Sequence, residues 1–62
     1  MKIETKYSYE KLYTLTQESD LLKMIAEEVG EIGAEGTLAY IKEAIKTGKT
    51  ITVGSCKFRM KK

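Results

Sequence analysis

Residues 37–60 have the sequence TLAYIKEAIKTGKTITVGSCKFRM, and we take this stretch as the one that decides the fold. Its first part predicts a helix over residues 37–46. Leu38, Ile41 and Ile45 share one face of this helix, since positions three, four and seven residues apart lie on the same side. The pattern is typical of a helix that packs against a core through a single face.

A tight β-hairpin is predicted after Gly48, which ends the helix. Gly54 and Ser55 fit a two-residue type II′ turn, which needs glycine at its first central position. The expected pairs are Val53 with Cys56, Thr52 with Lys57, Ile51 with Phe58 and Thr50 with Arg59. This register puts the apolar side chains on one face, and a shift by one residue would mix them with the polar ones. Cys56 is therefore expected in the core.

An earlier helix is predicted from Thr16 or Ser19 to Val29, and Gly30 is its expected end. Its apolar stripe consists of Leu21, Leu22, Ile25 and Val29, flanked by Met24 and Ala26. Acidic residues in its first turn suit the partial positive charge of a helix N-terminus.

The glycine-rich segment 30–36, GEIGAEG, is predicted to be a flexible turn between the two helices, with Thr37 as the N-cap of the second. The alternative is a phosphate-binding loop, because Gly33 and Gly36 match the GxxG of a KH-type RNA-binding domain. Four nearby glutamates oppose that alternative, since they would repel a nucleic-acid backbone.

The N-terminal residues 1–7 alternate in polarity, which predicts a half-buried strand with Met1, Ile3, Thr5 and Tyr7 on its inner side. Ser8 can then cap a short helix that starts at Tyr9. The alternative for residues 13–16 is a strand, because they are β-branched or aromatic at most positions.

These elements predict one α+β domain over residues 1–62: an N-terminal strand, two or three short helices and a C-terminal β-hairpin, with a three-stranded antiparallel sheet. The composition, 42% apolar and 32% charged, is that of a globular protein. No apolar run approaches the roughly 20 residues of a membrane span, and no secretory signal is evident. We therefore expect a cytoplasmic protein without membrane contact.

The chain has one cysteine and no histidine. It therefore lacks the usual ligands of a zinc site, the partner for an internal disulfide and the side chain most often used in general acid-base catalysis. We expect no enzymatic activity, no cofactor and no metal.

Charge is distributed unevenly along the chain. Residues 1–41 contain four lysines and eight acids, whereas residues 42–62 contain seven basic residues and one acid. Such asymmetry favours a polyanion as the partner of the C-terminal part. The alternative is that these lysines only solvate a hairpin and a tail.

The order of helix, glycine, basic residue and hairpin resembles the C-terminal end of a Cro-type phage repressor. The residues that carry this resemblance are Ile41, Ala44, Ile45, Gly48, Lys49 and Ile51, with Ala26, Val29 and Gly30 similar to the positioning helix and turn of its helix-turn-helix. The resemblance implies a small DNA-binding transcriptional regulator of phage or mobile-element type.

The same resemblance assigns roles to individual residues. Tyr40, Lys42 and Lys46 would lie at the major groove. Phosphate contacts would come from Lys49, Lys57, Arg59, Lys61 and Lys62. A homodimer is expected, because such regulators span two half-sites, and the C-terminal strand with Phe58 and Met60 is its expected edge.

A second class of function remains open. The protein can instead be a small protein-binding modulator, such as a phage-type inhibitor of a host protein. In that case the working surface would be the acidic helical face formed by Glu27, Glu28, Glu31 and Glu35.

Overall fold

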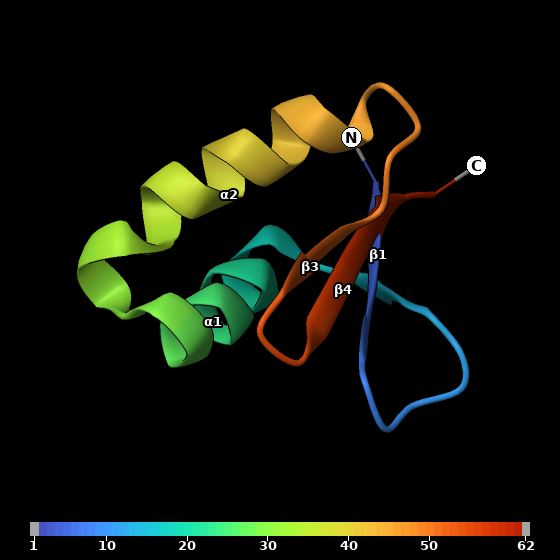
Figure 1. Cartoon of the computed structure of the whole chain (residues 1–62), viewed down its shortest axis with the longest axis horizontal. Coiled ribbons are helices and arrows are strands. Elements are labelled where there is room, and N and C mark those ends of the chain that lie inside the picture. The colour runs from blue at the N-terminus through green and yellow to red at the C-terminus, as the bar shows by residue number, and fades with distance from the viewer. Residues whose placement is uncertain (1, 62) are drawn as a thin grey trace.

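The computed structural model describes residues 2–61, which form a four-stranded antiparallel sheet with two helices on one side of it (Figure 1). The elements are β1 (Ile3–Tyr7), β2 (Thr14–Thr16), α1 (Glu18–Val29), α2 (Glu31–Ile45), β3 (Ile51–Val53) and β4 (Cys56–Met60). The predicted α+β class is confirmed. Met1 is predicted on the inner side of the first strand, and Lys62 is predicted to contact a phosphate. Both lie outside the described residues.

The sheet has the strand order β2-β1-β4-β3, so its two central strands are the first and the last. The hairpin register is confirmed for three of the four expected pairs, the last of which is Ile51 with Phe58. The pairing of β3 with β4 ends at this pair, so the expected pair of Thr50 and Arg59 does not form. The sheet has a fourth strand, β2, at residues that we gave as a strand only in the alternative to the short helix. The expected dimer edge is wrong, because β4 is paired on both sides and offers no free edge.

The hairpin turn has the predicted type II′ geometry. Gly54 has φ 56°, and no described residue other than glycine has positive φ, so Ser55 lies in the ordinary region. A type II′ turn needs this combination, with positive φ at its first central position only. The turn is therefore specified by one glycine.

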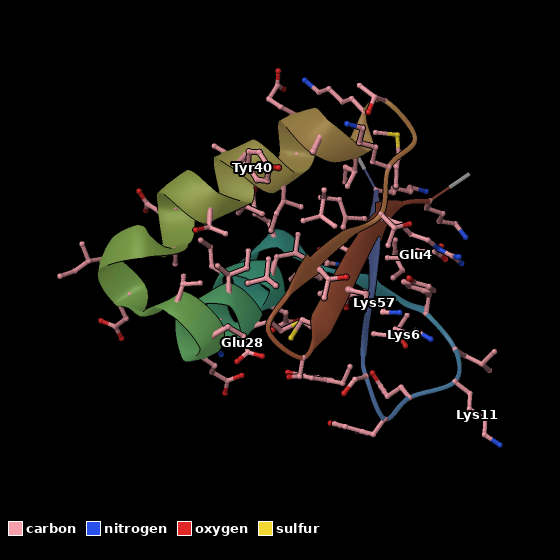
Figure 2. The ribbon with its side chains drawn as sticks, viewed as in Figure 1. Glu4, Lys6, Lys11, Glu28, Tyr40 and Lys57 are labelled. Carbon is pink, nitrogen blue, oxygen red and sulfur yellow. The ribbon has the colours of Figure 1, made fainter. Side chains whose placement is uncertain are left out.

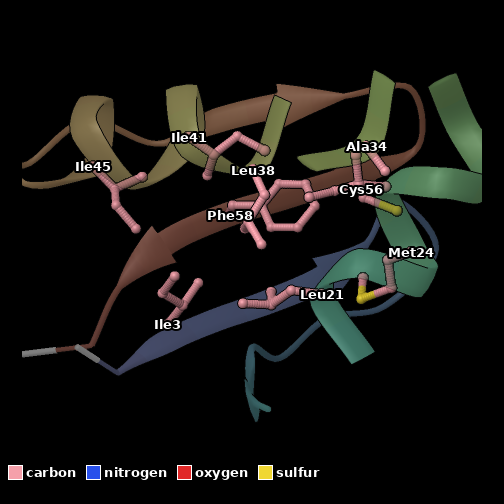
Figure 3. Close-up of a cluster of buried hydrophobic side chains, with 10 residues drawn as sticks. Ile3, Leu21, Met24, Ala34, Leu38, Ile41, Ile45, Cys56 and Phe58 are labelled. Atoms are coloured by element: carbon pink, nitrogen blue, oxygen red, sulfur yellow. The ribbon is translucent and has the colours of Figure 1, made fainter. Parts of the chain in front are cut away.

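The core lies between the helices and the inner face of the sheet (Figure 3). Its buried apolar residues are Ile3, Leu21, Met24, Ile25, Ala34, Leu38, Ile41, Ile45, Cys56 and Phe58. Burial raises the pKa of the Cys56 thiol, which keeps it neutral. Among residues 2–61 Thr5 is the buried polar residue, and its hydroxyl forms a hydrogen bond with the Thr16 hydroxyl 2.7 Å away. The predicted inner faces of α2, β1 and β4 are thereby confirmed. On α1 the predicted stripe is wrong at Val29, which is exposed, whereas Leu21 and Ile25 are buried as predicted together with Met24.

The short helix predicted from Tyr9 is wrong. Residues 8–13 form turns and bends, and residues 14–16 form β2, which pairs with β1 as Ile3 with Thr16 and Thr5 with Thr14. The Thr5–Thr16 hydroxyl contact joins the two strands. Strand pairing therefore overrides the weak local preference for helix.

The flexible turn predicted at residues 30–36 is also wrong, because α2 begins at Glu31 and contains Gly33 and Gly36. Only Gly30, with φ 89°, separates the helices, and the expected N-cap role of Thr37 is wrong too. Ala34 explains the longer helix, since it extends the buried face of α2 by one turn. The GxxG glycines lie inside a helix, where their N–H groups are directed along the helix axis rather than into a phosphate cradle.

Candidate functional site

The side of the sheet turned away from the helices carries most of its charge. Side chains alternate along a strand, so Glu4 and Lys6 of β1 and Lys57 and Arg59 of β4 point outward, opposite the buried core residues. Figure 2 shows Glu4, Lys6 and Lys57 on this side. We call it the outer sheet face, and its residues are Glu4, Lys6, Tyr13, Leu15, Thr52, Lys57 and Arg59.

Two lysines oppose each other at the centre of this face. Lys6 and Lys57 are direct partners in the register of β1 and β4. Like charges directly opposite on neighbouring strands destabilise a sheet. Neither ammonium has a carboxylate within ion-pair distance among residues 2–61, and the nearby Glu4 accepts a hydrogen bond from Arg59 Nε at 3.0 Å. The centre of the outer sheet face therefore holds positive charge that the described chain does not neutralise.

Tyr13 adds an aromatic ring to the same face. The Arg59 guanidinium carbon lies 3.7 Å from the ring centroid, and Lys6 Nζ lies 5.4 Å from it. Both are within the range of a cation-π interaction. The ring thereby holds two cations on one side of the sheet.

A second group of basic residues surrounds a shallow hollow where α2 leads into β3. Its lining includes Lys46, Lys49, Arg59 and Lys61, and contains no acidic residue. Arg59 belongs both to this lining and to the outer sheet face. We call the resulting series the basic band, made of Lys6, Lys57, Arg59, Lys49 and Lys61.

The structure separates the predicted site residues into two groups. Lys49, Lys57 and Arg59 belong to the basic band, whereas Tyr40 and Lys42 lie on α2, across the sheet from Lys57. Lys46, at the end of α2, borders the hollow. Tyr40 and Lys42 therefore lie on the opposite side of the sheet from Lys57 (Figure 1), whereas Lys46 shares the hollow with Arg59.

The helix lysines are also occupied within the chain. Lys42 forms an ion pair with Glu18, and Lys46 Nζ lies 2.7 Å from Glu43 Oε2. Hydrogen bonds from these lysines lower the pKa of both carboxyl groups. Tyr40 is 65% exposed. The helix therefore presents less free positive charge than the sequence suggested.

Lys6 and Tyr13 were missed as site residues. Lys6 stood in the acidic half of the sequence, and Tyr13 in a segment predicted as helix. The outward alternation of residues 1–7 was a usable signal for Lys6, but it becomes informative only when β1 is placed beside β4, a pairing between the two ends of the chain.

One glutamate of the acidic helical face, Glu28, forms hydrogen bonds that stabilise the fold. Glu28 Oε1 accepts hydrogen bonds of 2.7 Å from both the backbone N–H and the hydroxyl of Ser55, at the hairpin turn. The other three glutamates of this face, Glu27, Glu31 and Glu35, form no ion pair within the described part of the chain.

We expect Glu28 to make the free energy of unfolding depend on pH in the acid range. The Ser55 N–H and hydroxyl lower the pKa of Glu28 below its ordinary value of 4.5. A lowered folded-state pKa stabilises the fold above the unfolded pKa, and this contribution is lost as pH falls from about 4.5 through the folded value. Urea unfolding of the wild type and of Glu28→Gln, followed between about pH 6 and about pH 2.5, should show a shallower acid dependence for the variant. Parallel curves would contradict the assignment.

Comparisons with protein-family models, with curated proteins and with solved structures give no match. The resemblance to Cro-type repressors thus stays a prediction. Within residues 2–61 no helix is long and apolar enough to cross a membrane, and no cluster of three or more Cys, Asp or Glu side chains is arranged to hold a metal ion.

Proposed function

We propose that this protein is a small nucleic-acid-binding protein, of the DNA-binding regulator type, that contacts phosphates through the basic band. The observation that carries the proposal is the opposition of Lys6 and Lys57 without a neutralising carboxylate within the described chain. A bound polyanion turns this repulsive pair into an attractive site, because phosphates spaced along a backbone can neutralise both lysines.

The helix contributes less to this proposal than the sheet does. The N-terminal residues of a recognition helix contact the bases. In α2 the N-terminal part carries Glu31 and Glu35, which would repel DNA. The β3–β4 hairpin is also part of a sheet rather than a free ribbon. The outer sheet face is therefore the proposed contact surface, with the Tyr13 ring holding the Arg59 and Lys6 side chains on it.

The test is the salt dependence of binding to a labelled DNA duplex and to a single strand of the same sequence. Each neutralised phosphate contributes about −0.9 to the slope of log affinity against log salt for a duplex. Lys6→Gln combined with Lys57→Gln is expected to flatten that slope by about two units. The fold should be retained, because the change removes a like-charge pair.

The matched control is Lys42→Gln combined with Lys46→Gln. It removes the same charge from lysines that are held in ion pairs on α2, so the slope is expected to change by much less. If the helix pair flattens the slope and the sheet pair does not, the helix-turn-helix interpretation replaces ours. If neither matters near physiological salt, the proposal fails. The protein-binding modulator then becomes the better hypothesis, with Glu27, Glu31 and Glu35 as the residues to change.

A further inference from the structure

The outward side of α2 exposes large apolar side chains. Ile32 is fully exposed (102%), and Tyr40 is 65% exposed. Both lie four residues from Gly36, so the three positions fall on one face of the helix. Val29, at the end of α1, is 44% exposed and lies beside Gly33. Figure 2 shows Tyr40 on the surface of α2, outside the layer between the helix and the sheet.

Two glycines lie on this same face, and neither the backbone conformation nor the packing within one chain requires glycine there. Gly33 and Gly36 have no positive φ, unlike Gly30. A Cβ at Gly36 would meet nothing within 4 Å, and one at Gly33 only an ordinary contact with Val29. Glycine is a poor residue for a helix interior. Its presence here is explained if another helix approaches the backbone closely.

The charges along α2 indicate which helix approaches it, and in which orientation. Its N-terminal end carries Glu31 and Glu35, with Glu27 nearby, and none of these has an ion-pair partner within residues 2–61. Basic residues outnumber acidic ones at the opposite end, where Lys42, Lys46 and Lys49 accompany Glu43; Lys42 and Lys46 pair within the chain with Glu18 and Glu43, and Lys49 has no ion-pair partner among residues 2–61. A second α2 in antiparallel orientation places acidic ends beside basic ends, whereas a parallel one would oppose like charges.

We propose that the protein forms a two-fold homodimer in which α2 packs antiparallel against α2 of a second copy, with Gly36 at the crossing point. The spacing is self-complementary, because Ile32 and Tyr40 are equally distant from Gly36. Ile32 of one protomer then packs beside the partner's Tyr40, and the reverse contact forms by symmetry. This dimer does not depend on the nucleic-acid proposal, because its interface excludes the basic band.

Sedimentation of the whole chain tests the dimer. Mass is measured over a concentration series from about 5 to 500 μM, a range that brackets dissociation constants in the micromolar region. Wild type is expected to approach twice the chain mass, and Ile32→Lys to remain monomeric. Leu12→Lys is the matched control, because Leu12 is 79% exposed in the β1–β2 loop, and it should dimerise like wild type. Circular dichroism checks that both variants are folded.

Cysteine cross-linking tests the orientation. In the antiparallel dimer positions 32 and 32 of the two protomers lie about 12 Å apart along the axis, too far for a disulfide. Oxidation of Ile32→Cys alone or Tyr40→Cys alone should therefore give little cross-linked product, and a mixture of the two should give the mixed disulfide at least tenfold more abundantly. A wild type that stays monomeric overturns the proposal, as does an Ile32→Lys dimer like that of Leu12→Lys. Efficient disulfides within each single variant overturn the antiparallel arrangement.

Discussion

Replacing Phe58 by Ala is expected to destabilise the protein by about 3–5 kcal/mol, the usual range for removing a fully buried aromatic side chain. Phe58 is completely buried and lies on the central strand β4, opposite Thr5 on one side and Ile51 on the other. A domain of this size has a total stability of about 3–9 kcal/mol. The variant should therefore lose most of its stability and unfold partly at room temperature.

Urea unfolding followed by circular dichroism measures this loss. Leu12→Ala is the control, because Leu12 is 79% exposed, and its effect should stay within about 0.5 kcal/mol. A loss below about 1 kcal/mol for Phe58→Ala would mean that the core is not organised around this side chain.

The second large effect is expected for Gly54→Ala, through the turn that fixes the hairpin register. The φ of 56° costs a residue with a side chain about 1–2 kcal/mol. The new Cβ would also lie 2.5 Å from Glu28 Oε1, so the Glu28 carboxylate must shift, which weakens its hydrogen bonds to Ser55. The expected result is a less stable hairpin, measured as a lower urea midpoint and as faster amide exchange in β3 and β4.

A double-mutant cycle separates the two causes. With Glu28→Ala in the background, Gly54→Ala should destabilise the protein less than in the wild type, because the Glu28 contact is already absent. Strictly additive losses would show that backbone strain alone is responsible.

Local patterns were sufficient to predict the parts of the fold that local sequence determines. Leu38, Ile41 and Ile45 recur with the period of a helix, and Gly54-Ser55 sets the hairpin register without reference to the rest of the chain. Both predictions are confirmed. Long-range pairing decides between helix and strand at residues 14–16, which local sequence left open, since these residues become a strand by lying beside β1.

Glycine misled the prediction at residues 30–36. Gly33 and Gly36 are typical of a turn in an isolated segment, yet α2 runs through them because Ala34 continues its buried face and α1 packs alongside. The same limit applies to the candidate site. Lys57 and Arg59 were predicted from the basic C-terminus, whereas Lys6 joins them only through the pairing of β1 with β4.

The pairing of the first strand with the last also determines how the protein resists mechanical force. Ile3 lies opposite Met60, and beyond them the Lys61 N–H donates to the Lys2 carbonyl at 3.0 Å. Tension applied between the two ends of the described chain therefore acts at adjacent points on antiparallel strands, where the hydrogen bonds run perpendicular to the strands. The ladder is pulled apart one bond at a time, starting at Lys2 and Lys61, instead of being sheared as a whole. A molecular motor that pulls on these ends would therefore need less force than one that shears β1 along β4.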